Sequence, residues 1–134
     1  TLQITKWDVS FLRKSDLNLE RSLRFGDRIH GHLVSGHVDG RTQLLEKKWA
    51  GECLILSFVL PTENRFELWK KSSIAINGVS LTVNDMQNNT FQVCLVPETL
   101  RKTNLESLKE KEFVNFETDY YMKGLLASQK ENHA

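Results

Sequence analysis

Short runs of alternating apolar residues, separated by turn signals, limit the folds open to this chain more than any other feature. The clearest run is 73–83, Ser-Ile-Ala-Ile-Asn-Gly-Val-Ser-Leu-Thr-Val, where apolar residues alternate on both sides of Asn77-Gly78. Asn-Gly accepts positive φ at both positions and therefore closes a two-residue type I′ hairpin. Alternation with a period of two is typical of strands with one buried face. The pattern predicts an all-β domain of short strands.

Other segments carry weaker forms of the same signal. The run 53–60 is almost continuously apolar, which predicts a strand buried on both faces. Residues 120–129 have a helical composition, so we expect a short C-terminal helix followed by a polar tail, 130–134. The remaining strands are expected at 32–38, 42–45, 91–96 and 114–117.

Composition excludes several classes of function. The net charge is +1, from 18 Lys and Arg against 17 Asp and Glu, so a nucleic-acid or membrane surface is not expected. No apolar run approaches the roughly 20 residues of a membrane-spanning helix, and no signal peptide is recognisable. Cys53 and Cys94 lie in apolar stretches without metal-site spacing, which favours buried, reduced thiols and a cytoplasmic location.

Two short internal matches suggest a duplicated domain. The pattern Thr-Leu-x-x-Thr at 1–5 recurs at 99–103, and the pattern of residues 17–20 recurs at 114–117 with nearly the same offset. The simplest interpretation is that the chain begins near the end of one barrel and contains a second. The expected division is therefore the tail of a first barrel at 1–23, a second barrel at 24–118, and a C-terminal helix and tail at 119–134.

Three blocks resemble the riboflavin synthase family of lumazine-binding proteins. The most specific is Gly-His-Leu-Val-Ser-Gly-His at 31–37, preceded by the block 19–23. The second is the hairpin 73–83, and the third is 95–103 followed by 114–117. The resemblance implies the C-terminal half of such a protein: a six-stranded antiparallel Greek-key barrel with a short C-terminal helix.

The activity implied by the resemblance is a dismutation. Two molecules of 6,7-dimethyl-8-ribityllumazine exchange a four-carbon unit to give riboflavin and 5-amino-6-ribitylaminouracil, with no metal or redox cofactor. Catalysis would rest mainly on holding two rings face to face. The resemblance also implies a homotrimer, with lumazine synthase as a suggested partner.

Ser80 and Thr82 are two residues apart on a predicted strand, so their hydroxyls share one face. The residues alone favour an ordinary solvent-facing surface. The resemblance assigns Ser80, Leu81 and Thr82 to the lumazine site, with Ser80, Thr82 and His37 as catalytic candidates. It also assigns Gly36, His37 and Val38 to ring contacts, and a second contacting segment to Val96, Pro97, Glu98, Thr99, Leu100 and Arg101.

The three histidines are open to more than one interpretation. Three histidines at 30, 32 and 37 without a carboxylate or thiol partner are a weak metal signal, so no metal is expected. We expect His37 to contact ligand, His32 to be structural and His30 to be exposed.

Three other positions are also open to two interpretations. Lys71 matches a ligand-side lysine of the family but is equally a solvated side chain. Asp119 matches a family acid but is equally a helix N-cap. Asn77 stands where the family often has an acid, and we expect its amide to accept a hydrogen bond from Ser80.

Two other functions compete with the enzyme. A lumazine- or flavin-binding protein of the same fold would hold one ligand without turning it over. A nucleic-acid-binding barrel would need basic and aromatic strand faces, which the sequence does not suggest.

Overall fold

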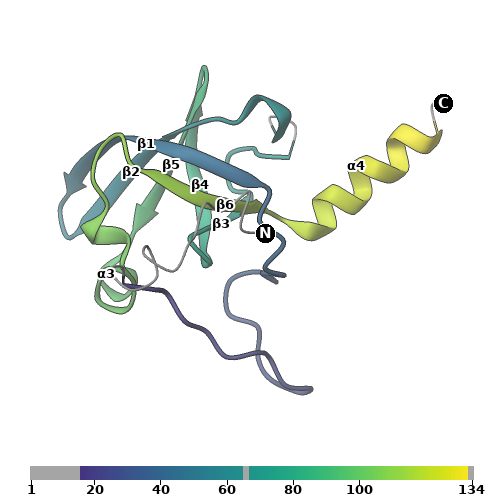
Figure 1. The fold of residues 1–134 in the computed structure, drawn as a ribbon, viewed down its shortest axis with the longest axis horizontal. Helices are drawn as coiled ribbons and strands as arrows, with labels where there is room; N and C mark the ends of the chain where they lie inside the picture. The colour runs from purple at the N-terminus through teal and green to yellow at the C-terminus, as the bar shows by residue number, and fades with distance from the viewer. Residues whose placement is uncertain (1–15, 65–66, 133–134) are drawn as a thin grey trace.

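The computed structural model of this protein describes residues 16–64 and 67–132 (Figure 1). Its strands are β1 (Gly40–Ala50), β2 (Cys53–Val59), β3 (Ser73–Ile76), β4 (Val79–Gln87), β5 (Thr90–Leu95) and β6 (Phe113–Thr118). Its helical elements are η1 (Thr62–Asn64), α3 (Pro97–Lys102), η2 (Leu105–Ser107) and α4 (Tyr120–Asn132). The internal match at residues 1–5 lies outside the described residues.

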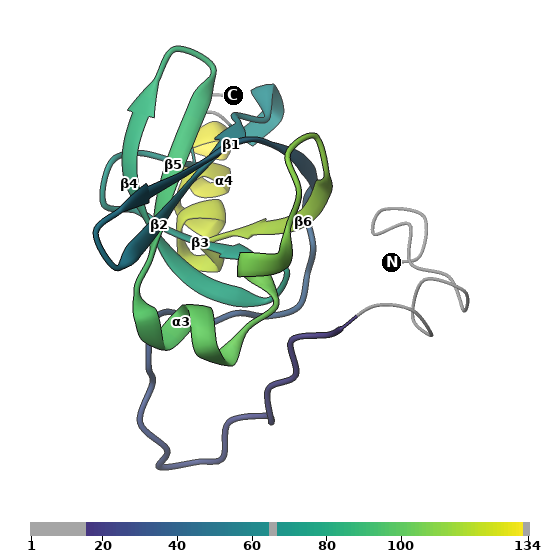
Figure 2. The same ribbon diagram turned by 90° about the vertical axis from the view of Figure 1, so that its left-hand side faces the viewer.

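The strands form a closed antiparallel barrel in the order β1-β2-β5-β4-β3-β6. The expectation of a six-stranded antiparallel barrel with a short C-terminal helix is confirmed. Inward-pointing residues from all six strands fill the interior, and Phe58 stacks on Phe91 with ring centroids 5.4 Å apart. Figure 2 shows α3 beneath the barrel, and Figure 1 shows α4 leaving the barrel at the end of β6.

The Asn77-Gly78 hairpin forms as predicted. Ile76 pairs with Val79, which leaves a two-residue loop between β3 and β4. Asn77 and Gly78 have φ of 47° and 80°, the left-handed values that a type I′ turn requires. The local sequence therefore fixes the register in which Ala75 faces Ser80.

The predicted strand at 32–38 is wrong, because this segment is irregular and β1 starts only at Gly40. Gly31 and Gly36 have φ of 82° and 80°, which no extended strand tolerates. The segment is instead held by side-chain contacts described below. The predicted strand at 42–45 is the first part of a longer one, the 11-residue β1.

The apolar run 53–60 is buried mainly on one face rather than on both. Leu54, Leu56 and Phe58 are fully buried, whereas Cys53 and Ile55 are half-buried. Cys94 lies on the neighbouring strand β5 and is also half-buried, so the expectation of fully buried thiols is wrong. Both thiols are free. Burial and a hydrogen bond with Cys53 raise the pKa of Cys94.

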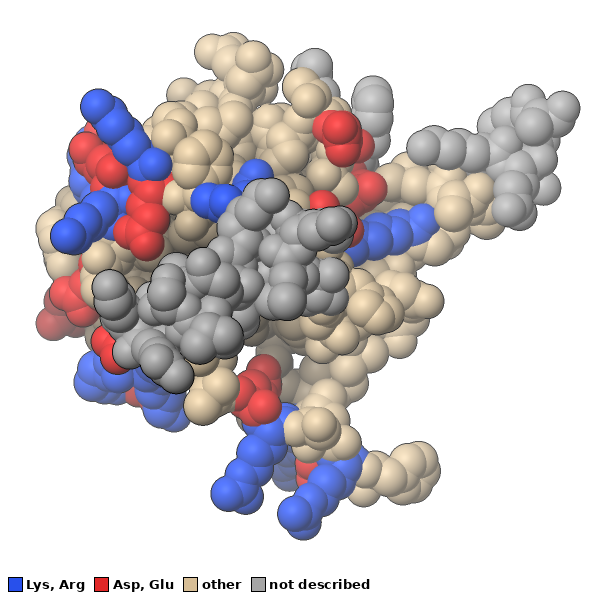
Figure 3. Space-filling view, viewed as in Figure 1, with Lys and Arg blue, Asp and Glu red and all other residues tan. Residues whose placement is uncertain are grey.

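The C-terminal helix is confirmed and extends three residues beyond the predicted end, to Asn132. In Figure 1 it projects from the barrel, with Tyr120, Tyr121 and Leu125 exposed. Neither α4 nor any other helix within 16–64 and 67–132 is long and apolar enough to cross a membrane. On the face drawn in Figure 3, acidic and basic side chains are intermixed rather than gathered by sign.

Candidate functional site

The outer face of β4, β3 and β6 carries a row of three residues. Ala75 on β3 pairs with Ser80 on β4 and with Glu117 on β6, and directly opposed residues point to the same side of a sheet. Their sequence neighbours Ile74, Ile76 and Leu81 point into the core. Ala75 is 1% exposed. The row therefore places the Ser80 hydroxyl and the Glu117 carboxylate on either side of a buried alanine.

The irregular segment 31–37 is fastened to one end of this row through Ser80. The Nδ1 atom of His32 lies 2.7 Å from Ser80 Oγ, and the backbone N–H of His32 donates to the same oxygen at 3.2 Å. His32, and not His37, is therefore the histidine that meets the predicted site serine.

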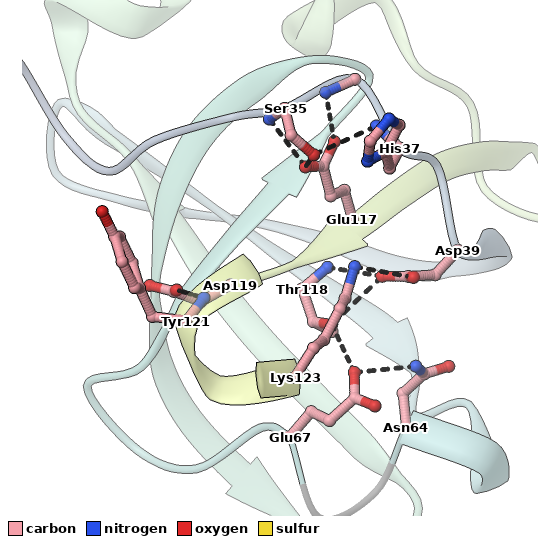
Figure 4. A network of polar contacts seen from close by, with 11 residues as sticks. Ser35, His37, Asp39, Asn64, Glu67, Glu117, Thr118, Asp119, Tyr121 and Lys123 are labelled. Atoms are coloured by element: carbon pink, nitrogen blue, oxygen red, sulfur yellow. Dashed lines mark hydrogen bonds and ion pairs between the residues drawn. The ribbon is translucent and has the colours of Figure 1, made fainter. Parts of the chain in front are cut away.

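Glu117 fastens the other end of the segment. Its carboxylate accepts hydrogen bonds from the Ser35 backbone N–H at 2.8 Å, the Ser35 hydroxyl at 2.7 Å and the Gly36 N–H at 3.0 Å (Figure 4). The side chain is buried, with 3% of the residue exposed. A buried carboxylate is stable when hydrogen bonds replace its water, and three donors do so here. Glu117 thus fixes the path of segment 31–37 at Ser35 and Gly36.

The environment of His32 favours the neutral imidazole. Burial lowers the pKa of His32 below its ordinary value, although the negative charges of Asp119 and Glu117 oppose this shift. The Nε2 atom is buried and has no hydrogen-bond partner among the described residues. The imidazole therefore stays uncharged at neutral pH and retains one unused polar atom beside Ser80.

Gly31 allows the segment to approach β4 this closely. A Cβ at this position would lie 2.3 Å from Ser80 Oγ and 2.8 Å from Ser80 Cβ, distances that real Cβ atoms do not show. Its φ of 82° also favours glycine.

Asn77 does not bond Ser80 as expected. Its Oδ1 accepts the backbone N–H of Asn115 at 2.9 Å, and its own N–H donates to the Asn115 carbonyl. The expectation is wrong because the amide reaches β6, where it ties the hairpin turn to that strand. Asn18 adds a second tie, donating to the Asn77 carbonyl at 3.0 Å and to Asn104 Oδ1 at 2.9 Å.

A second polar network secures the junction between β6 and α4. Asp39 accepts the Thr118 backbone N–H at 2.8 Å and pairs with Lys123 Nζ at 2.7 Å (Figure 4). The Thr118 hydroxyl also contacts the carboxylate of Glu67. These contacts hold β6, and with it Glu117, against the start of β1.

Asp119 caps α4. Its Oδ1 accepts the backbone N–H of Tyr121 at 2.9 Å, which confirms the N-cap interpretation. Asp119→Ala is expected to destabilise the helix by about 1 kcal/mol, because an orphan N–H loses its acceptor. Far-ultraviolet circular dichroism should lose helical signal, whereas Asp119→Ser should retain it. Equal losses in the two variants would contradict a capping role.

The other predicted site residues take different positions. Thr82 is exposed on the outer face of β4, opposite Ser73, and Lys71 is exposed with φ of 79° near the same end of the ladder. Leu81 is buried in the core, so only its backbone is available to a ligand. The segment Val96–Arg101 forms the connection after β5 and most of α3, where Glu98 pairs with Arg101 and Lys102.

His37 is exposed, and its N–H donates to the Ser35 hydroxyl at 3.3 Å. Val38 is half-buried just before β1. Sequence reasoning missed Glu117 and assigned His32 only a general structural role. The alternation in 114–117 did carry a signal, because Glu117 lies opposite in phase to the core residue Phe116.

Known proteins are similar to this chain in sequence. Riboflavin synthase of Brucella abortus (strain 2308) is 41% identical over 103 residues, which cover 77% of this chain and 51% of that protein. Riboflavin synthase of Photobacterium leiognathi is 38% identical over 104 residues, covering 78% of this chain and 48% of that protein. The chain thus spans about half the length of these curated relatives.

Solved structures show the same fold. LumP complexed with riboflavin matches with a TM-score of 0.64 and 20% identity, covering 69% of this chain and 50% of that one. LumP complexed with 6,7-dimethyl-8-(1'-D-ribityl) lumazine matches with a TM-score of 0.63, 20% identity and coverages of 69% and 52%. The family profile described as "Lumazine binding domain" matches residues 35–119, which include Ser80, Glu117 and all six strands of the barrel. The chain therefore belongs to the lumazine-binding domain family.

Proposed function

We propose that this barrel binds 6,7-dimethyl-8-ribityllumazine and riboflavin, as the second lumazine-binding barrel of a riboflavin synthase. The observation that carries the proposal is the row Ser80, Ala75 and Glu117, across which 31–37 is fastened at both ends. This arrangement presents the segment's backbone groups and the Ser80 hydroxyl together. Membership of the lumazine-binding family gives the ligand class.

In this proposal the ligand ring contacts Gly36, His37 and Val38 on one side and Ser80 and Thr82 on β4. Because β5 runs antiparallel to β4, the end of β5 lies at the same end of the sheet as the start of β4. Residues 96–101 follow β5 and would contact the ligand mainly through backbone groups. Lys71 would reach the ribityl chain. Asp119, used as a helix cap, would act on the site only through its charge.

The proposed reaction is the dismutation of two 6,7-dimethyl-8-ribityllumazine molecules to riboflavin and 5-amino-6-ribitylaminouracil. This chain would hold one of the two molecules, so a second barrel must supply the other. The exposed apolar side chains of α4 (Tyr120, Tyr121 and Leu125) support an oligomer, and the proposed state is a homotrimer. The proposed barrel domain is 24–118, with a Greek-key strand order, and the proposed location is the cytoplasm.

A binding protein without turnover is the second candidate. LumP shares the fold and is seen in complexes with riboflavin and with a lumazine, whereas the curated relatives of this chain are riboflavin synthases and support the enzyme. An assay of turnover in the assembled protein distinguishes the two functions, because a binding protein would hold lumazine without forming riboflavin.

Titration of riboflavin into the chain, followed by flavin fluorescence, tests the proposal. Ser80→Ala combined with Thr82→Ala should raise Kd about 30-fold, as two hydrogen bonds of about 1 kcal/mol each predict. The matched control removes two exposed hydroxyls elsewhere, Thr62→Ala with Ser128→Ala, and should bind like the wild type. A folded wild-type chain that binds neither riboflavin nor the lumazine would contradict the proposal.

A further inference from the structure

The contact between His32 Nδ1 and Ser80 Oγ can run in either direction, because Nδ1 accepts in one neutral tautomer of the imidazole and donates in the other. Ser80 Oγ accepts the His32 backbone N–H at 3.2 Å, and its remaining hydrogen is within reach of His32 Nδ1 at 2.7 Å. A hydroxyl has one hydrogen and two lone pairs. If that hydrogen goes to Nδ1 and one lone pair is used by the N–H, a single lone pair of Oγ stays free.

We propose that His32 is a positioning residue for Ser80: its neutral imidazole accepts the Ser80 hydroxyl hydrogen at Nδ1, so that Oγ presents its free lone pair to an N–H or O–H of the bound molecule. This inference rests on the proposed function, since the bound molecule is the lumazine or flavin. It assigns to His32 a task in the site that is distinct from the ring contact proposed for His37.

The surroundings of the imidazole support the neutral form. The groups that face it are the Ser80 hydroxyl from β4, the Glu117 carboxylate from β6 and the Asp119 carboxylate that follows β6. The Glu117 carboxylate is already engaged by three donors from Ser35 and Gly36. Burial nevertheless lowers the pKa of His32, so that protonation occurs below the ordinary histidine value of 6.5.

Protonation reverses the contact. An imidazolium has hydrogens on both nitrogens, so Nδ1 would donate to Oγ and occupy the lone pair offered to the ligand. Affinity is then expected to fall as the pH is lowered through the pKa of His32. Asparagine at position 32 has an amide oxygen near the position of Nδ1 but does not titrate, so it separates the hydrogen-bonding role from the charge.

The test measures riboflavin and lumazine Kd from about pH 7.5 to about pH 5.5 for the wild type, His32→Ala, His32→Asn and the control His30→Asn. His30 is exposed and lies two residues away, so His30→Asn makes the same substitution at a position outside the contact with Ser80. We expect His32→Ala to raise Kd about fivefold at the upper pH, the value of one hydrogen bond. At the upper pH, His32→Asn should bind as tightly as the wild type. Its affinity should not fall as the pH is lowered, whereas the affinity of the wild type and of His30→Asn should fall.

The other outcomes are decisive as well. His32→Ala binding as tightly as His30→Asn would overturn the inference, and so would a folded His32→Asn that binds as weakly as His32→Ala. Acid weakening that persists in His32→Asn would assign the titration to another group and also overturn it. Failure of the wild type to bind either ligand would instead overturn the proposed function. Circular dichroism of each variant establishes that its barrel is folded.

Discussion

Glu117→Ala is expected to destabilise the protein by about 2 to 3 kcal/mol, because hydrogen bonds to a charged group are worth about 1.5 to 3 kcal/mol each and are not additive. The carboxylate is buried and joins β6 to Ser35 and Gly36 through three hydrogen bonds. Alanine leaves these donors without an acceptor and releases one end of segment 31–37. Urea unfolding measures the loss of stability, and riboflavin titration measures the accompanying loss of affinity.

Two further variants serve as comparisons for Glu117→Ala. Glu117→Gln keeps an oxygen for Ser35 but sets an amide group against the Gly36 N–H, so an intermediate loss of about 1 kcal/mol is expected. Glu46→Ala removes an exposed glutamate from β1 and should leave stability and binding nearly unchanged. A Glu117→Ala protein as stable as Glu46→Ala would show that the carboxylate does not hold the segment.

Gly31→Ala is expected to weaken riboflavin binding about 30-fold, since displacing segment 31–37 from β4 removes about two ligand hydrogen bonds of about 1 kcal/mol each. The added Cβ would lie 2.3 Å from Ser80 Oγ, so the segment must move away from β4. The contact between His32 and Ser80 and the path to Gly36 would change together. Fluorescence titration reports the loss.

Gly26→Ala is the matched control for backbone strain. Gly26 has φ of 92°, similar to Gly31, but a Cβ there would meet no atom within 4 Å. Both substitutions force a left-handed alanine, at about 1 kcal/mol, and only Gly31→Ala adds the clash with Ser80. If the two variants lost affinity equally, the close approach of Gly31 to Ser80 would have no part in binding.

The hairpin at 73–83 was predictable because its determinants are local. Asn77-Gly78 selects the turn, and alternation then decides that Ile74 and Leu81 face inward while Ser80 faces outward. The same logic yields the other strands of the barrel. The sequence does not predict α3 at 97–102, because residues 96–101 indicate only a ligand-contacting segment that follows a strand.

The path of segment 31–38 was not predictable in the same way. Its alternation of polar and apolar residues resembles a strand, but Gly31 and Gly36 adopt positive φ. Contacts with Ser80 and Glu117, 48 and 82 residues away in the sequence, hold it in that form. No local pattern distinguishes His32 from His37 as the partner of Ser80, because that choice depends on the register of β3 with β4 and β6.

An amide NMR titration of the chain with riboflavin tests most directly whether the ligand binds on the outer face at Ser80. We expect shift changes to concentrate in 31–38, in 80–82 and in 96–101, the segments proposed to contact the ligand. Changes confined to the opposite end of the barrel, such as the turn between β4 and β5 at 87–90, would contradict it.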